Sequence, residues 1–563
     1  LCACEPGYSN DGPTSCVEDE GPCADDSECE DENPCTVGRC DPERGCEQEP
    51  ASGPCDDGDP CSTEDACVDG HCEGGEIDLD EDDDGYISGE CAGGSDCDDS
   101  SEDINPGAVE GPFGDPVCSD GADNDCDDLT DEADDGCVAG FDHQIFRSVG
   151  PGNQLPLATG ATGSLTITGG TAIFEVALPD RVGVGDAIQY DSDDDGYVDD
   201  ICFIHGRSSS TSFEVRDESG DVPDALTTPD EDRAVFRAYT GLADAERGST
   251  NPGIDPYVRG FDPWTGGLDL TISGVDAVWN IACYADGIET EPLEIEGWLM
   301  DRERYLRIFT PVSESEVGTS QRHEGRWDES RFLVDVAGNY GIQIHEDFTV
   351  VEGLQVAVHG GDGVGGPIHI ADEIFRTVVS HNMVTVLGGD IGLSRRGIYD
   401  NGEETRVFNN IAFGIQGTEN WTSCFYHNYG TNSFFYNNTA VGCSTGFVVF
   451  ANSMTAINNI AQGCDDGFGE NAAWGGAFSP SSDFNVSDLA IDAPGPSSRH
   501  GVTVLFVDAL SHDYHLAPED TAAMDWGTAL SGDLISPVLD DIDGEPRPSG
   551  RAWDIGADEL LVE

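Results

Sequence analysis

The stretch Arg406-Val407-Phe408-Asn409-Asn410-Ile411-Ala412 decides the fold, because its Asn-Asn centre returns twice further along the chain. The pair recurs, followed by small or apolar residues, at Asn437-Asn438-Thr439-Ala440 and Asn458-Asn459-Ile460-Ala461, with spacings of 28 and 21 residues. Asn382 lies 27 residues before the first pair, and Asn485 lies 27 residues after the start of the last pair. A period of twenty-odd residues, built from short apolar runs broken by Gly and Asn, is typical of a parallel β-helix.

The residues around each pair fit such coils. Arg406-Val407-Phe408 and Phe435-Tyr436 precede Asn pairs and are predicted strands. Each coil would bury an apolar face against its neighbours, while Asn at the corners adopts left-handed backbone geometry and hydrogen-bonds along the stack. Cys443 and Cys464 lie 21 residues apart, so stacked coils are expected to bring them to bonding distance.

Two acidic loops spell D-x-D-x-D-G-Y, at 80–86 and 191–197. Alternate carboxylates around a tight turn are hard oxygen ligands that suit Ca²⁺, and Gly lets the chain bend over the ion. The alternative is a solvated acidic turn. The expected ligand residues are Asp80, Asp82, Asp84 and Tyr86 in the first loop, and Asp191, Asp193, Asp195 and Tyr197 in the second.

Neither loop is an EF-hand, because its twelfth position is Cys91 or Cys202 where a bidentate Glu would be needed. The remaining ligands must come from nearby carboxylates. The candidates are Asp96, Asp98 and Asp99 after the first loop, and Asp199 or Asp200 after the second.

The amino-acid composition limits the kinds of molecule that this protein is expected to bind. The 563 residues include 114 Asp and Glu against 23 basic residues, a net charge of −91, and every basic residue is Arg. The absence of Lys excludes a Schiff-base lysine, and the charge argues against nucleic acid or an anionic membrane surface as partner. The acidity fits cation binding and also a saline habitat. No run of 18 apolar residues occurs, so no membrane span is expected.

Cysteine usage indicates the compartment. Seventeen of the 22 Cys fall between Cys2 and Cys137, in acidic sequence with few large apolar residues. Such a segment needs disulfides, which predicts a secreted or cell-surface protein; thiolate metal binding is the alternative. A further candidate disulfide joins Cys202 to Cys283.

The N-terminal residues Leu1-Cys2-Ala3-Cys4-Glu5-Pro6-Gly7-Tyr8 with the later Cys16 resemble the back half of an EGF-like module. The resemblance implies a Cys4–Cys16 pair and a partner for Cys2 upstream, so the natural chain is expected to begin before Leu1.

Three more motifs follow the first acidic loop: Asp96-Cys97-Asp98-Asp99, Asn105-Pro106-Gly107-Ala108 with Glu110, and Asp123-Asn124-Asp125-Cys126-Asp127. With that loop, residues 76–137 resemble the MopE-type metal-binding repeat of secreted bacterial proteins. The resemblance implies further calcium ligands and a Cys97–Cys126 disulfide. Asp128 stands where the family usually has Gly, so the second cluster is expected to bind less tightly or with another geometry. The implied further ligands are Asp96, Asp98, Asp99, Asp123, Asp125 and Asp127.

The last fifty residues contain Asp541-Ile542-Asp543-Gly544-Glu545-Pro546-Arg547 and Asp554-Ile555-Gly556-Ala557-Asp558-Glu559. They resemble the C-terminal end of secreted right-handed β-helix proteins of the pectin-lyase-like kind, which implies that they finish and cap the solenoid. Such a cap would keep the last coil from offering an open edge.

The expected fold class is mainly β, a right-handed parallel β-helix with N-terminal disulfide-rich and calcium-binding modules and a small β domain. Alternating runs such as Ser164–Thr168 and Ala172–Val176 predict that β domain. The expected division is a cysteine-rich arm at 1–75, a calcium module at 76–139, the β domain at 140–264, the β-helix at 265–515 and the cap at 516–563.

The function expected from these features is structural or adhesive: a secreted calcium-binding protein that contacts glycans or copies of itself, with filament assembly a further option. Solenoid aromatics could form a platform for sugar rings, although burial in the coils is the competing interpretation. These aromatics are Trp421, Phe425, Tyr426, Tyr429, Phe434, Phe435, Tyr436 and Trp474.

The alternative function is a lyase or glycoside hydrolase that acts on acidic polysaccharide from the β-helix face. Fold alone does not support it, and the candidate residues lie in no signature of such enzymes. The candidates are Asp465-Asp466, Arg395-Arg396, His381, His427 and Arg499-His500.

Overall fold

The computed structural model describes most of the chain after residue 142, as two compact units that divide at Gly140. From 143 to 561 it describes all residues except 161–162, 227, 263–266, 361–363, 389–393, 420 and 534–535. Before 143 it describes 8–10, 16–18, 23, 25–31, 33–41, 44–56, 65–73, 86, 88, 96–98, 100–101, 104–105, 122–124 and 126.

The described part of the first unit contains short hairpins and five disulfides. The hairpins pair β1 (Tyr8–Asn10) with β2 (Cys16–Glu18), β3 (Thr36–Asp41) with β4 (Gly45–Pro50), and β5 (Ala66–Val68) with β6 (His71–Glu73). A 3₁₀ turn, η1 (Asp26–Cys29), precedes β3. The disulfides are Cys23–Cys40, Cys29–Cys46, Cys35–Cys67, Cys55–Cys72 and Cys97–Cys126. The Cys97–Cys126 expectation is confirmed, whereas Cys2 and Cys4 lie outside the described residues.

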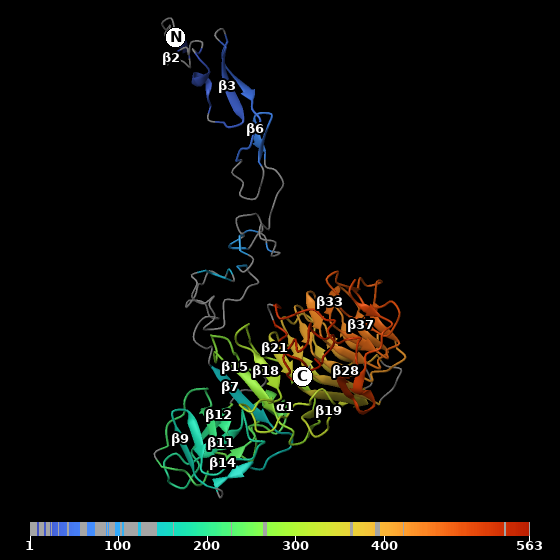
Figure 1. The fold of residues 1–563 in the computed structure, drawn as a ribbon. Helices are drawn as coiled ribbons and strands as arrows, with labels where there is room; N and C mark the ends of the chain where they lie inside the picture. The colour runs from blue at the N-terminus through green and yellow to red at the C-terminus, as the bar shows by residue number, and fades with distance from the viewer. Residues whose placement is uncertain are drawn as a thin grey trace. The chain divides into compact units, whose positions relative to one another are not determined.

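The second unit is a parallel β-helix, as expected, whose coils stack from β15 toward β33 and β37 in Figure 1. Three parallel sheets run along the stack. Sheet 1 contains β7 (Gln144–Val149), β15 (Val278–Cys283), β18 (Leu306–Phe309), β21 (Thr349–Glu352), β24 (Val378–Ser380), β27 (Arg406–Phe408), β30 (Ser433–Tyr436), β33 (Ser453–Ile457) and β36 (Ala477–Phe478).

Sheets 2 and 3 complete each coil. Sheet 2 contains β16 (Ile288–Glu289), β19 (Leu333–Gly338), β22 (Gln355–Gly360), β25 (Met383–Leu387), β28 (Ile411–Phe413), β31 (Thr439–Val441), β34 (Ile460–Gln462), β37 (Val486–Ser487) and β38 (Arg499–His500). Sheet 3 contains β17 (Leu293–Ile295), β20 (Tyr340–Ile344), β23 (Gly366–Ile370), β26 (Arg396–Asp400), β29 (Ser423–His427), β32 (Thr445–Val449) and β35 (Asp466–Glu470). Apolar side chains fill the interior, where the rings of Phe425, Phe447 and Phe468 stack at 4.7 and 4.9 Å.

The Asn pairs form the corner between sheets 1 and 2, which confirms the expected geometry. The first Asn of each pair has positive φ, 51° at Asn409 and 48° at Asn437. The second Asn is fully buried, and Asn410 Nδ2 donates to Asn438 Oδ1 at 3.0 Å. The same bond links Asn382, Asn410, Asn438, Asn459 and Asn485 into one ladder.

An insertion leaves the β-helix after its first strand. Its antiparallel sheet is ordered β8 (Ala158–Thr159), β14 (Ala234–Phe236), β11 (Ala187–Tyr190), β12 (Asp200–Ser209), β13 (Ser212–Arg216), β10 (Thr171–Phe174) and β9 (Leu165–Thr168), and α1 (Leu242–Glu246) follows it. Because β7 pairs in parallel with β15, the β-helix begins at Gln144, ahead of the boundary expected at 265. The small β domain is therefore inserted in the helix and does not precede it.

Two buried arginines join the insertion to the first coils. Arg147 on β7 binds both oxygens of Asp262 at 2.9 and 3.0 Å, and its guanidinium lies 3.7 Å from the Phe203 ring centroid. Arg237 binds Asp186 at 2.7 Å and Asp286 at 2.8 Å. Pairing is what allows such charges to be buried.

The C-terminal segment lies along the side of the β-helix, whereas the sequence predicted a cap on its end. After the hairpin of β39 (Phe506–Asp508) and β40 (Asp513–Leu516), which η5 (Ala509–Ser511) connects, the chain runs along the Asn corner. The amides of Asn409, Asn437 and Asn458 donate to the carbonyls of Asp540, Asp554 and Thr528. Three successive coils therefore hold the segment, because their left-handed Asn residues offer amide donors to it.

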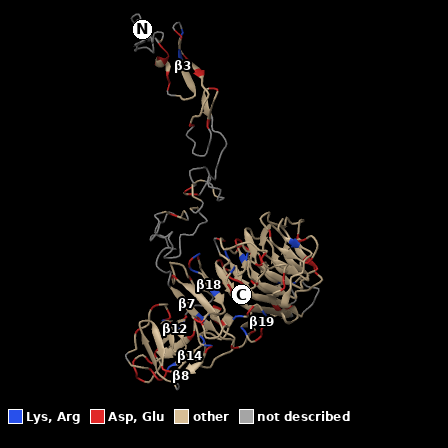
Figure 2. Ribbon diagram, in the orientation of Figure 1, with Lys and Arg blue, Asp and Glu red and all other residues tan. Residues whose placement is uncertain are grey.

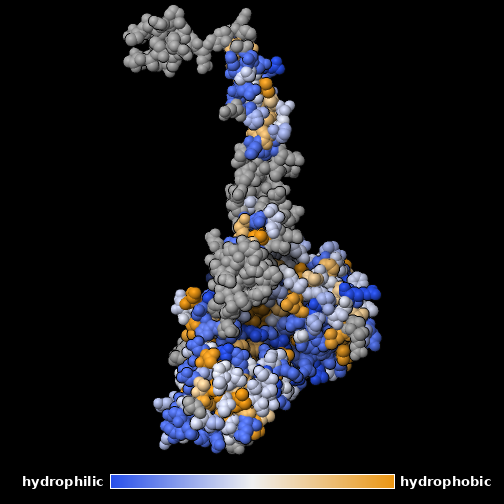
Figure 3. All heavy atoms as spheres, turned by 60° about the vertical axis from the view of Figure 1, so that its left-hand side comes forward, coloured by the Kyte–Doolittle hydropathy of each residue, from blue (hydrophilic) through white to orange (hydrophobic). Residues whose placement is uncertain are grey.

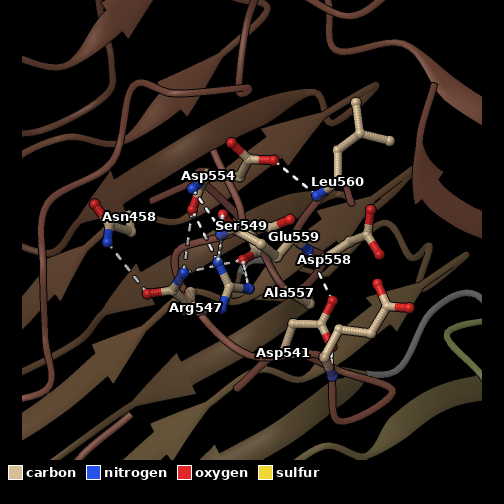
Figure 4. A network of polar contacts seen from close by, with 12 residues as sticks. Asn458, Asp541, Arg547, Ser549, Asp554, Ala557, Asp558, Glu559 and Leu560 are labelled. Atoms are coloured by element: carbon tan, nitrogen blue, oxygen red, sulfur yellow. Dashed lines mark hydrogen bonds and ion pairs between the residues drawn. The ribbon is translucent and has the colours of Figure 1, made fainter. Parts of the chain in front are cut away.

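Arg547 organises this segment (Figure 4). It donates to Glu559 Oε2 at 3.1 Å and to the carbonyls of Asp554 and Gly556 at 3.1 and 2.8 Å. The side chains of Arg547 and Glu559 are both fully buried. The two C-terminal motifs thus fold onto each other through one ion pair.

Both disulfide predictions for the second unit are wrong. Cys443 bonds to Cys424, which leaves Cys464 free, and Cys202 and Cys283 are free and buried. Cys424 lies in sheet 3 of the preceding coil, so the bond runs from a strand to the turn that follows sheet 2. Cys202 and Cys283 lie in different hydrophobic clusters, one in the insert and one in the helix interior.

The described part of the face drawn in Figure 3 is mainly hydrophilic. Acidic segments are spread over the ribbon and basic ones are few (Figure 2), and one face in Figure 3 shows hydrophobic side chains scattered among hydrophilic ones. No helix within the described ranges is long and apolar enough to cross a membrane.

Candidate functional site

The second acidic loop connects β11 to β12 in the insertion. The two strands pair antiparallel from Ala187↔Phe203 to Tyr190↔Asp200, so the loop begins directly where the hairpin ends. Asp191 is buried, while Asp193 is exposed. The hairpin therefore holds the first carboxylate of the motif in place and leaves the others at the surface.

Backbone N–H groups orient the Asp191 carboxylate. Gly196 donates to its Oδ2 at 2.6 Å, and Asp193 and Asp195 donate to its Oδ1 at 3.3 Å. Burial acts to raise the pKa of Asp191, but these N–H groups lower it overall. Gly196 has a φ of 87°, a positive value that Gly adopts readily because it has no Cβ atom.

Three carboxylates converge around the loop. Oxygen atoms of Asp191, Asp193 and Asp199 all lie within 4.8 Å of one another. Two ligands of one calcium ion are at most about 5 Å apart, because each lies roughly 2.3–2.6 Å from the metal. The negative charge of Asp195 is the largest cause that raises the pKa of Asp193. A bound cation would relieve that repulsion.

The other expected ligands of this loop differ in their contacts. The Oδ1 atom of Asp195 accepts from the backbone N–H of Tyr197 at 3.0 Å, and the Tyr197 side chain is 75% exposed. Of the two open candidates after the loop, Asp199 joins the cluster and binds Ser192 N at 2.8 Å. Asp200 is the first residue of β12.

Sequence reasoning missed Asp230, which lies beside Asp191. Burial is the main cause that raises the pKa of Asp230, and the Asp191 charge adds to it. Asp230 is 7% exposed, and its Oδ2 atom has no hydrogen-bond partner among the described residues. No motif marks it, since it follows the loop by more than thirty residues.

In the first unit the structure brings together parts of the expected MopE-type module. Asp96 is buried beside the Cys97–Cys126 disulfide, and the Asp123 carbonyl lies 3.4 Å from Cys97 Sγ. Asp98 accepts from Ser100 Oγ at 2.6 Å, and Tyr86 is half-buried. The remaining expected ligands, Asp80, Asp82, Asp84, Asp99, Asp125 and Asp127, lie outside the described residues.

A second feature is a row of rings along sheet 3, one from each of six successive coils, whose last two members follow the strands β32 and β35. The neighbouring ring centroids are 4.5 to 6.0 Å apart. Arg396 lies over two of the rings, at 4.0 and 3.8 Å. The row runs through Tyr340, His369, Tyr399, Tyr426, Phe450 and Trp474, and we call it the aromatic row.

The aromatic row uses only part of the expected platform. Phe425 and Phe435 are buried in the helix interior, as the competing interpretation held. Phe434 and Tyr436 pack in the cluster beneath the C-terminal segment. Tyr426 and Trp474 belong to the row, and Trp421 packs edge-on against Phe450. Sequence reasoning missed Tyr340, His369 and Tyr399, whose near-30-residue spacing was the available signal.

The catalytic candidates do not converge. Asp466 begins β35 and Arg396 begins β26 in sheet 3, whereas Arg499 and His500 form β38 in sheet 2. His427 and its partner Asp400, 2.7 Å apart, are fully buried.

Comparison with known proteins adds little. No protein-family model matches the chain, and no curated protein matches it. Among solved structures, the chain is similar to the tailspike protein gp49 from Pseudomonas phage LKA1, at 12% sequence identity over 64% of this chain and 65% of that chain. The TM-score is 0.13, which supports no statement about this chain.

Proposed function

We propose that this protein is an extracellular calcium-binding protein with a structural or adhesive role. The observation that carries the proposal is the convergence of the Asp191, Asp193 and Asp199 carboxylates within 4.8 Å. Calcium accepts six to eight oxygen ligands in flexible geometry, so side chains, backbone carbonyls and water can complete the sphere.

The donor set fits calcium better than a softer metal. All three converging groups are carboxylates, and neither His nor thiolate belongs to this cluster. Carboxylate and carbonyl oxygens suit hard cations, whereas imidazole and thiolate select zinc and copper. The buried Asp230 oxygen without a partner adds negative charge beside the loop.

The disulfide pattern supports an extracellular location. Five disulfides hold the described parts of a first unit that contributes few buried apolar side chains. Small disulfide-dense modules of this kind persist in oxidising environments. Calcium in the acidic loops would stabilise the same protein against the repulsion of its −91 net charge.

Calorimetric titration of the full chain with Ca²⁺ tests the proposal. The substitution Asp193→Asn removes one converging oxygen charge, and we expect at least a roughly tenfold loss of affinity at one site. Asp194→Asn is the matched control, because it removes the same charge from an exposed loop position outside the cluster and Asn tolerates the positive φ there.

Equal titrations of wild-type protein and Asp193→Asn would contradict the proposal. Equal losses for Asp193→Asn and Asp194→Asn would show that the loop attracts cations only through its net charge.

The aromatic row favours a second function, contact with glycans. Sugar rings present apolar C–H faces that pack on aromatic side chains, and Trp474, which ends the aromatic row, is 65% exposed. We expect binding to an oligosaccharide array, with Trp474→Ala at least about threefold weaker. Trp526 is 51% exposed and packs against Arg499 of β38 in sheet 2, so replacing it should change nothing. An array that binds both variants equally would contradict this role.

A further inference from the structure

Arginines gather in a groove on the outer face of sheet 1, although acidic residues outnumber basic ones 114 to 23 in this chain. The groove has a volume of about 430 Å³, and its lining includes Arg302, Arg307 and Arg376 against two carboxylates, Glu352 and Asp540. Three of the 23 arginines thus line one cavity of the size that holds a small ligand.

Both carboxylates of the lining are already paired. Arg307 Nη2 binds Glu352 Oε2 at 2.8 Å, and Arg322 binds the other oxygen. Burial acts to raise the pKa of Glu352, but these two guanidinium groups lower it well below its usual range. Asp540 Oδ1 lies 3.1 Å from His381 Nε2. The charge of Glu352 is therefore compensated by two arginines, and the Asp540 side chain already has a polar neighbour.

Positive charge remains available at the rim. Arg302 is exposed and makes no ion pair with any described residue. Arg376 binds Glu404 through Nε at 2.8 Å, which holds its guanidinium in place. A guanidinium group presents a planar fork of donors that matches carboxylate or sulfate oxygens.

Much of the remaining lining is apolar or aromatic. Tyr305, Phe348, Val350 and Val378 provide this surface on the sheet side, while Leu539 of the C-terminal segment forms part of the opposite side. Ligand sites commonly combine such apolar walls with a few convergent polar groups. The groove therefore offers both a hydrophobic face and fixed cationic donors.

We propose that this groove binds a small organic anion with an apolar face, about one or two sugar rings in size, which bears a carboxylate or sulfate. Arg302 and Arg376 would bind the anionic group, and the aromatic walls would pack against the ring. This site lies on sheet 1, so it is independent of the calcium loop and of the aromatic row on sheet 3.

Ligand-observed NMR titration of the full chain at fixed ionic strength tests the proposal with three sugars. D-glucuronate and D-glucose 6-sulfate carry the two candidate anions, and D-glucose carries neither. We expect at least one anionic sugar to bind several-fold more tightly than glucose, and its binding to weaken with added NaCl. Arg302→Ala should reduce affinity roughly fivefold, and Arg302→Lys should restore part of it.

Arg551→Ala is the matched control, since Arg551 is exposed and lies outside the groove. The preference between glucuronate and glucose 6-sulfate identifies which anion the groove favours. Equal binding of glucose, no binding of either anionic sugar, or unchanged affinity in Arg302→Ala would each overturn the proposal.

Discussion

Arg547 shows how a single residue fixes the course of the C-terminal segment. Its sequence context indicated a β-helix terminus, but the ion pair with Glu559 could not be predicted. The two residues are twelve apart, and their contact depends on how the segment folds back over the coils. Because both are fully buried, each depends on the other to remain charged.

Replacing Arg547 by Met tests this dependence. The substitution keeps much of the side-chain volume but leaves Glu559 buried and unpaired, so we expect a loss of about 3–5 kcal/mol in the free energy of unfolding. Denaturant unfolding of the full chain measures it. The exposed Arg551, changed to Met, should alter stability by less than about 0.5 kcal/mol. Equal stability of the two variants would contradict the account.

The acidic loop was predictable from its residues because ligand spacing is a local property. Asp191 and Asp193 lie within the motif, and the structure places them together. The choice between Asp199 and Asp200 was open, since it depends on where the hairpin resumes. Pairing of Tyr190 with Asp200 assigns Asp200 to the strand and leaves Asp199 for the loop.

At the scale of elements, the Asn ladder was predictable and the other corners were not. Left-handed residues also precede the sheet 1 strands, at Phe348, Arg376 and Glu404, where nothing in the residue type signals the conformation. These residues adopt the left-handed backbone conformation because the turn between coils requires it. Strand β7 was missed for a related reason: its partner β15 lies beyond the whole insertion.

Removing one ladder member tests the corner. Asn438 Oδ1 accepts from the backbone N–H of Asn410 at 3.1 Å, and its Nδ2 donates to the Val407 carbonyl at 2.7 Å. Asn438→Ala leaves buried groups unsatisfied, so we expect a loss of about 2–4 kcal/mol by denaturant unfolding.

Asn432→Gly is the control for that experiment, because Asn432 is exposed and Gly accepts its positive φ. We expect a change within about 0.5 kcal/mol. A ladder variant as stable as this control would show that the ladder bonds contribute nothing net.

At the scale of the whole molecule, composition predicted the disulfides of the first unit but not how the insertion joins the helix. The charge argues against nucleic acid as a partner, and the cysteine content predicted the disulfides that hold the described part of the first unit. The buried pairs Arg147–Asp262 and Arg237–Asp286, which join the insertion to the helix, connect residues far apart in sequence and carry no local signature. The groove arginines were missed for the same reason.

The central claim is that the loop at 191–199 binds calcium, and a crystal structure of the full chain grown with calcium chloride tests it most directly. The account predicts an anomalous-scattering peak about 2.3–2.6 Å from carboxylate oxygens of Asp191, Asp193 and Asp199. A loop in the same conformation that holds only water at hydrogen-bonding distances would contradict it.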